Sequence, residues 1–279
     1  MIVDMHTHTF PDKIADTALT GMEREIHQNR GYEYFRKLAG TGDALSESTI
    51  RNGLDLSVVL PVATRPVQSA GINRFAYENN QKTQKTKVFS FGAIHPDNED
   101  FREILRDVRS MGLKGIKLHP DYQHVCFDDI KYLRIMDYAA ELGLLISVHA
   151  GEDFGLPHKI HCTPEMIVNV IGSIRPTGLI LAHMGGMNLW DGVEEKLIGS
   201  DVYLDTAFVL EEQAPHLERN QLVRMIRDHG ADRILFGTDS PWVDQKEAVE
   251  KIRMLNLTKE EENAILGENA VRLLGITAG

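Results

Sequence analysis

Short apolar runs recur along the chain, and each has the length of a buried β-strand. Most of them are continuously apolar instead of alternating, which is typical of strands covered on both faces. The runs occupy residues 2–6, 56–62, 88–94, 115–119, 144–149, 178–183, 202–207 and 234–239. The pattern therefore predicts eight strands in one buried sheet.

Helical patterns fill the intervals between these runs. In 98–111, apolar residues recur at helical spacing. Thr163 precedes a proline, as an N-cap does at a helix start, and Thr258 with Glu261 forms a capping box. Strands joined by helical crossovers must run parallel. Eight such units predict an α/β fold, a single (β/α)8 TIM barrel that occupies residues 1–279 as one domain.

The segment 9–55, after the first run, is longer than one crossover requires. We expect a helical insertion there. Long insertions in compact domains are either functional or merely tolerated, so the segment forms either a lid over the barrel mouth or an extra pair of surface helices.

Composition narrows the classes of function. Of the 279 residues, 42% are hydrophobic and 25% are charged, as in an ordinary globular enzyme, and the formal net charge of −11 repels nucleic acid and anionic membranes. We therefore expect a small-molecule substrate and neither a nucleic-acid nor a membrane partner. Without a phosphate-binding glycine motif, no organic cofactor is expected. Only Cys126 and Cys162 are present, and no apolar leader is evident, which favours a cytoplasmic protein. The sequence does not decide between a monomer and a homo-oligomer.

Polar residues gather where the predicted strands end. In a barrel, the carboxyl ends of the strands meet at one mouth, where active sites are built. The polar residues at these ends are His6, His8, Lys117, His119, His149, His183 and Asp239. One histidine at a strand end is unremarkable, but several on one rim predict a site.

These strand ends also carry a family resemblance. The His6-x-His8 pair, "GIKLHP", the His149 and His183 strand ends and "GTDSPW" resemble the amidohydrolase superfamily, in the amidohydrolase-2 branch that contains aminocarboxymuconate-semialdehyde decarboxylase-like proteins. The resemblance runs to "ILGENAVRLLGI", near the end of the chain. It implies that His6, His8, His149 and Asp239 bind one divalent metal, zinc or alternatively manganese, with His183 beside it as an acid/base or polarising group.

The residue types suit that chemistry. Neutral imidazoles and a carboxylate bind zinc, and a zinc site with an open position activates water near neutral pH. Asp239 would carry the proton and His183 would stabilise the developing oxyanion, which gives a hydrolase. The alternative is a non-oxidative decarboxylase, in which the same groups protonate a carbon as carbon dioxide leaves. A third and less favoured alternative is a metal-binding barrel without turnover.

Further residues are expected to bind substrate. Lys117 either pairs with a substrate carboxylate, which we favour, or is carboxylated and bridges two metals, as in binuclear relatives. His119, Trp242 and Arg65 complete the predicted substrate contacts, since a guanidinium binds a carboxylate well. His158 and His161, on a loop after the fifth predicted strand, either contact the substrate or are surface histidines, and we favour the surface.

Overall fold

Parallel strands form the centre of the molecule. The structure, a computed structural model, describes residues 1–157, 159–176, 178–214 and 216–276. The strands are β1 (Val3–Thr7), β2 (Leu56–Val59), β3 (Val88–Ser90), β4 (Gly92–Ala93), β5 (Gly115–Leu118), β6 (Leu145–Val148), β7 (Leu179–Leu181), β8 (Tyr203–Asp205) and β9 (Ile234–Leu235). Each of the eight predicted runs contains a strand, and the α/β barrel class is confirmed.

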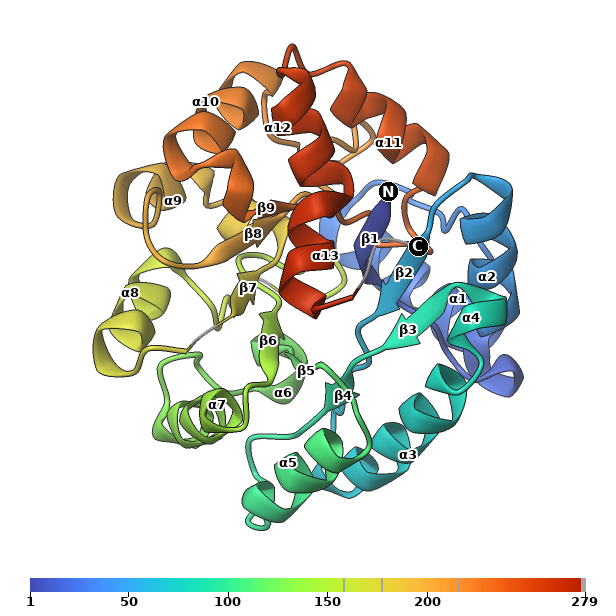
Figure 1. The fold of residues 1–279 in the computed structure, drawn as a ribbon, viewed down its shortest axis with the longest axis vertical. Helices are drawn as coiled ribbons and strands as arrows, with labels where there is room; N and C mark the ends of the chain where they lie inside the picture. Colours follow the sequence, from blue (N-terminus) through green and yellow to red (C-terminus); the bar gives the residue numbers. More distant parts are fainter. Residues whose placement is uncertain (158, 177, 215, 277–279) are drawn as a thin grey trace.

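The strands are hydrogen-bonded in chain order as two parallel sheets, β1-β2-β3 and β4 to β9. Phe91 alone separates β3 from β4, so one chain segment belongs to both sheets. On the other side, the Met5 amide donates to the Phe236 carbonyl at 2.8 Å, and Thr7 bridges to Ser240. The strands therefore surround a common axis, as Figure 1 shows.

Helices cover the outside of this ring (Figure 1). They are α1 (Asp12–Arg30), α2 (Gly42–Arg51), α3 (Ser69–Asn80), α4 (Thr83–Thr86), α5 (Phe101–Ser110), α6 (Pro120–Gln123), α7 (Ile130–Glu141), α8 (Pro164–Ser173), α9 (Trp190–Lys196), α10 (Arg219–His229), α11 (Gln245–Arg253), α12 (Lys259–Asn263) and α13 (Asn269–Leu274). Short turns of other helix types are η1 (Pro66–Gln68), η2 (His183–Gly185), η3 (Ala231–Arg233) and the π-type η4 (Ala264–Glu268). Among the described residues, no helix combines the length and apolarity needed to cross a membrane.

The predicted helix signals are confirmed. The Thr163 hydroxyl accepts the Met166 amide at the start of α8, and Thr258 and Glu261 form the capping box of α12. The apolar face of 98–111 is buried in α5. Local sequence therefore places the helix starts, because capping involves only neighbouring residues.

A buried carboxylate ties the first strand to the chain that follows the last. Asp4, on β1, accepts hydrogen bonds from the Thr238 amide and hydroxyl and from the Gln245 side chain. Burial raises the pKa of Asp4 to about 7. These bonds hold β1 to the chain that follows β9, and this junction carries the residues described next.

Candidate metal centre

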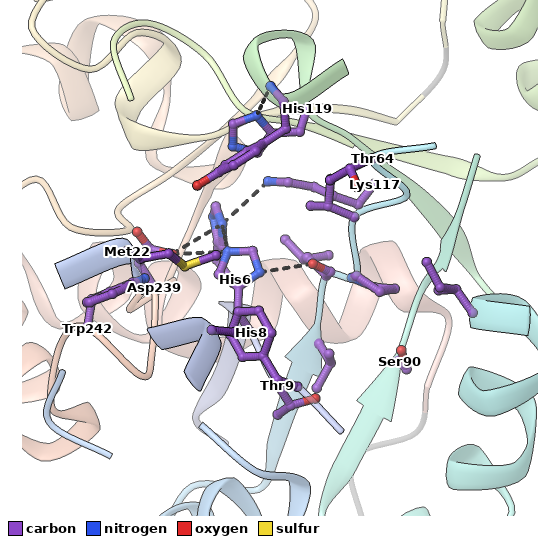
Figure 2. Close-up of a pocket in the computed structure, with 18 of the residues that line it drawn as sticks. His6, His8, Thr9, Met22, Thr64, Ser90, Lys117, His119, Asp239 and Trp242 are labelled. Carbon is purple, nitrogen blue, oxygen red and sulfur yellow. Dashed lines mark hydrogen bonds and ion pairs between the residues drawn. The ribbon is translucent and has the colours of Figure 1, made fainter. Parts of the chain in front are cut away.

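The polar strand ends face one cavity of about 1180 Å³ at the barrel mouth (Figure 2). Its lining includes His6, His8, Lys117, His119, His149, His183, Asp239 and Trp242. The carboxyl ends of parallel strands converge, so residues more than two hundred positions apart meet here. Arg65 does not line this cavity, and its side chain is exposed. Its neighbour Thr64 lines the cavity instead.

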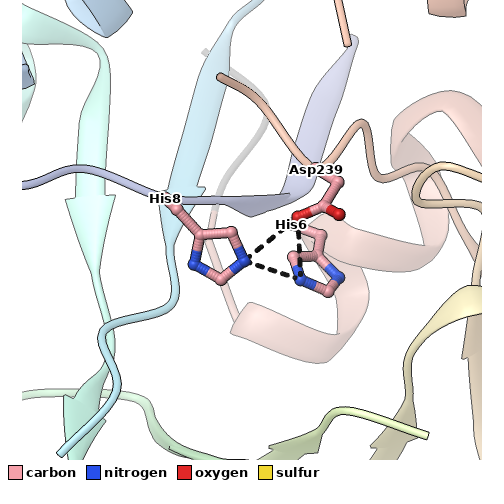
Figure 3. A group of neighbouring side chains, drawn as sticks. All are labelled: His6, His8 and Asp239. Carbon is pink, nitrogen blue, oxygen red and sulfur yellow. Dashed lines mark hydrogen bonds and ion pairs between the residues drawn. The ribbon is translucent and has the colours of Figure 1, made fainter. Parts of the chain in front are cut away.

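Three side chains converge from β1 and from the chain after β9, as Figure 3 shows. The Nε2 atoms of His6 and His8 lie 3.2 Å apart. Asp239 Oδ1 lies 3.1 Å from His8 Nε2 and 3.7 Å from His6 Nε2. His6 is buried, whereas the side chains of His8 and Asp239 are 20% and 16% exposed toward the cavity.

The partners of the two rings fix where their protons lie. His6 Nδ1 is 2.8 Å from Asp205 Oδ2, and His8 Nδ1 is 2.9 Å from the Leu60 carbonyl oxygen. Both partners are acceptors, so each Nδ1 carries the hydrogen and each Nε2 carries a lone pair. Burial also lowers the pKa of His6 well below its usual value, which favours the neutral ring.

This arrangement fits a cation. Two imidazole lone pairs and one carboxylate oxygen face the same point, where mutual repulsion is unfavourable without a positive charge between them. Lys117 Nζ, 3.4 Å from His6 Nε2, can donate to that atom, but His8 Nε2 and Asp239 Oδ1 still face each other. Nitrogen and oxygen donors of this kind suit zinc and similar divalent metals.

His149 and His183 form a second pair beside the first. His149 Nδ1 lies 3.1 Å from His183 Nε2, and the ring centroids of His6 and His183 are 5.2 Å apart. His183 Nδ1 lies 2.9 Å from the Ala207 carbonyl, so this ring too carries its lone pair on Nε2. His149 is therefore close to the centre, but it does not join the compact group of His6, His8 and Asp239.

A buried carboxylate lies behind His149. Asp121 Oδ2 is 4.0 Å from His149 Nε2, and within the described chain both atoms are buried without a hydrogen-bond partner. Asp121 Oδ1 lies 2.7 Å from His161 Nδ1. The expectation that His161 lies on the surface is wrong, because the Asp121 contact holds its ring inside; His158 lies outside the described residues.

Lys117 is fully buried at the end of β5. Burial lowers its pKa to about 8, although Asp205 and Asp239 act in the opposite direction. With this pKa the amine is mostly protonated at pH 7, and about one tenth of it is neutral. Its position beside His6 Nε2 brings it to the centre of the site and away from the protein surface.

His119 is positioned by neighbouring residues and lies in a second compact group of possible metal ligands, with His149 and Asp153. Its Nδ1 accepts the Tyr122 amide at 3.4 Å, so Nε2 carries the hydrogen, and this atom lies 3.3 Å from Asp153 Oδ2. The ring stacks on His149 with centroids 4.2 Å apart. His119 therefore lines the cavity and supports the position of His149.

Backbone conformation aims two of these side chains. His183 and Asp239 have φ values of 57° and 67°, in the left-handed region that L-residues rarely adopt. Such conformations cluster at functional sites. Gly237 is required for a different reason: a Cβ built on it would lie 2.8 Å from the Cβ of His6.

Sequence reasoning missed the carboxylates that support the histidines. Asp205 is fully buried at the end of β8, where it contacts His6 Nδ1 and accepts the His183 amide at 3.0 Å. It lies near the end of the run 202–207, so the strand-end signal that singled out the histidines also applied to it. Asp121 lies in the short helix α6 and Asp153 in the loop after β6, and only tertiary structure brings them to the rings.

The comparisons agree with this architecture. A sequence model of the amidohydrolase family matches residues 3–276, and the chain belongs to this family. No protein with a curated description matches the sequence.

Solved structures show the same fold at low identity. The chain is similar to 5-carboxyvanillate decarboxylase from Sphingomonas paucimobilis, with a TM-score of 0.70, 14% identity and 99% of each chain covered. The chain is also similar to a dihydroxybenzoic acid decarboxylase from Polaromonas, solved with bound manganese and the inhibitor 2-nitroresorcinol. The TM-score is 0.69 and the identity 16%, with 100% of this chain and 98% of that chain covered. A probable 2-pyrone-4,6-dicarboxylic acid hydrolase from Acinetobacter baumannii, with citric acid bound, gives 0.65 and 13% over 99% of each.

Proposed function

We propose that the protein is a metal-dependent hydrolase of a small, carboxylate-bearing molecule. The observation that carries this proposal is the convergence of His6 Nε2, His8 Nε2 and Asp239 Oδ1 at the open side of a deep cavity. Three donors with an accessible side are the arrangement of a catalytic metal site, whereas structural sites are closed.

One divalent ion would be held by His6, His8 and Asp239, with His149 as the fourth ligand. Zinc suits this donor set, and manganese is the alternative, as in the dihydroxybenzoic acid decarboxylase. When bound, such an ion supplies a Lewis acid and a nucleophilic water at neutral pH.

The chain's own residues would do the proton transfer. Asp239 Oδ1 faces the cavity, so this carboxylate can accept a proton from water and return it to the leaving group. His183 Nε2, whose tautomer is fixed by the Ala207 carbonyl, can accept a hydrogen bond or, once protonated, stabilise an oxyanion.

The charge of the substrate is inferred from a basic side chain at the polar end of the cavity. Lys117 is a buried amine in a protein of net charge −11, and Trp242 and His119 lie on the same lining. An anionic group on the substrate would offset the cost of burying this amine. The relatives named above take, or are named for, carboxylic acids, which supports the same proposal. Arg65, which is exposed, is no part of it.

Decarboxylation is the second candidate. Two of the similar structures are named as decarboxylases, and a cavity lined by both Asp239 and His183 can also deliver a proton to carbon.

We assign the enzyme to the cytoplasm, since Cys126 and Cys162 are both free.

Two observations also support a second ion. His149 Nδ1 and His183 Nε2 face each other at 3.1 Å, and Lys117, with its lowered pKa, lies beside His6. A carboxylated Lys117 would bridge two ions here, whereas with one ion Lys117 stays an amine available to the substrate.

One experiment tests these alternatives. Protein purified without chelator is analysed for metals and by intact native mass spectrometry, and then assayed with lactones, amides and phenolic acids while acid release and carbon dioxide are followed separately. About one ion per chain and acid release without carbon dioxide are expected. Carbon dioxide release would establish the decarboxylase, and two ions per chain with added mass on Lys117 would establish the binuclear centre. A metal content below one ion per chain that added zinc or manganese does not restore would refute the proposal.

A further inference from the structure

The cavity extends well beyond the polar strand ends, and apolar side chains of two helices line much of its far part, beside polar residues such as Lys13, Asn79 and Lys82. It passes from the metal centre between α1 and α3, and Figure 2 shows Met22 of α1 on the same cavity as His6 and Asp239. We infer that the substrate carries an extended apolar group, alkyl or aryl, which binds between these two helices. This inference deepens the proposed function, since it names what the same site binds besides the anionic group.

Helix α1 has two apolar faces, and packing against protein explains only one. Ala15 and Leu19 are buried in the interior. Ile14, Ala18 and Met22 follow at four-residue intervals, line the cavity and stay partly exposed, with Ile14 at 52%. Residues four apart lie on one face of a helix, so this second face is a continuous apolar wall directed at the cavity.

The opposite wall is built in the same way. Ile72, Phe75 and Ala76 of α3 line the cavity at helical spacing, and Val67 lies just before this helix. Phe75 is 51% exposed and Val67 is 84% exposed. Two helices from different parts of the chain therefore hold exposed apolar side chains on the two sides of one space.

Size and continuity decide what fills this space. Ligand pockets have volumes of roughly 300–1000 Å³ and bury most of a drug-sized molecule. At about 1180 Å³, this cavity exceeds what a single-ring acid at the metal centre requires. Because the apolar walls continue directly from the polar end, one molecule with an anionic head and an apolar tail fits both parts.

The test uses straight-chain carboxylic acids from acetate to decanoate as ligands of zinc-loaded protein, with affinities measured by calorimetry. Each added methylene is expected to tighten binding roughly fourfold until the walls are covered, because burying one methylene from water is favourable by that order. Met22→Ser and Phe75→Ser are expected to reduce this chain-length dependence by half or more. Met254→Ser and Phe35→Ser are matched controls, since these side chains are 55% and 57% exposed elsewhere, and should leave it unchanged.

Three outcomes would overturn the inference. The first is equal affinity for acetate and decanoate, and the second is a chain-length dependence that is unchanged in both variants. The third is a protein that shows no chain-length dependence and forms a dimer by light scattering, which Phe75→Ser dissociates. In the last case a second copy of the chain covers these walls. Metal content of the same samples separates this inference from the proposed function. Retained chain-length dependence in protein that binds no metal would support the apolar site and refute the metal enzyme.

Discussion

Asp205 controls which nitrogen of His6 is free to bind a metal. Its Oδ2 receives the His6 Nδ1 hydrogen at 2.8 Å, and its Oδ1 accepts the amides of His183 and Ala207, each at 3.0 Å. Asp205→Asn replaces one of these oxygens with an NH2 group. If the NH2 group replaces Oδ2, it faces one donor, the N–H of His6. If it replaces Oδ1, it faces two donors, the backbone amides of His183 and Ala207.

The less costly orientation turns the NH2 group toward His6. The ring must then accept at Nδ1, which moves its hydrogen to Nε2, the atom that faces His8 and Asp239. Loss of such a supporting partner typically lowers metal affinity 10- to 100-fold, which corresponds to about 1.4–2.7 kcal/mol. We expect Asp205→Asn to lose zinc affinity within that range.

Competition with a fluorescent zinc chelator gives the affinity, and thermal unfolding with and without zinc checks the fold. Asp201→Asn is the matched control, because Asp201 is exposed just before the same strand. If folded Asp205→Asn protein retained zinc within twofold of the parent, the role assigned to Asp205 would be refuted.

Other perturbations test the neighbouring residues. Asp239→Asn keeps one oxygen but removes the base, so kcat should fall by about 10² or more while much of the zinc stays bound; full turnover would remove Asp239 from the mechanism. Gly237→Ala places a methyl group 2.8 Å from His6 Cβ, so stability should fall by about 1–3 kcal/mol and zinc content should decrease; unchanged melting and zinc content would contradict this contact. In zinc-free protein, burial holds the pKa values of His6, His119 and His149 well below 6.5. As the pH falls, these histidines are protonated in the unfolded chain before they are protonated in the folded protein. The free energy of unfolding should therefore decrease below pH 6.5, by about 1.4 kcal/mol per pH unit for each ring. Equal unfolding free energies at pH 7.5 and 5.5 would argue against neutral buried rings.

The sequence by itself determined the fold class and indicated which polar strand ends meet at one cavity. Apolar runs and helix caps are local signals, and they placed strands and helix starts correctly. In a parallel barrel the strand ends must meet, so His6, His183 and Asp239 could be assigned to one mouth before their distances were known. The third run was expected as one strand and divides at Phe91, because its two parts pair with different neighbours.

Only the tertiary structure decided how the side chains are oriented and what surrounds them. The proton positions on His6 and His183 depend on Asp205 and the Ala207 carbonyl, which lie far away in sequence. The second apolar face of α1 could not be assigned from its pattern, because an apolar stripe has the same spacing whether it packs on protein or lines a cavity. Strand ends follow from local chain chemistry, whereas tautomers, burial and cavity walls depend on contacts that exist only after the chain has folded.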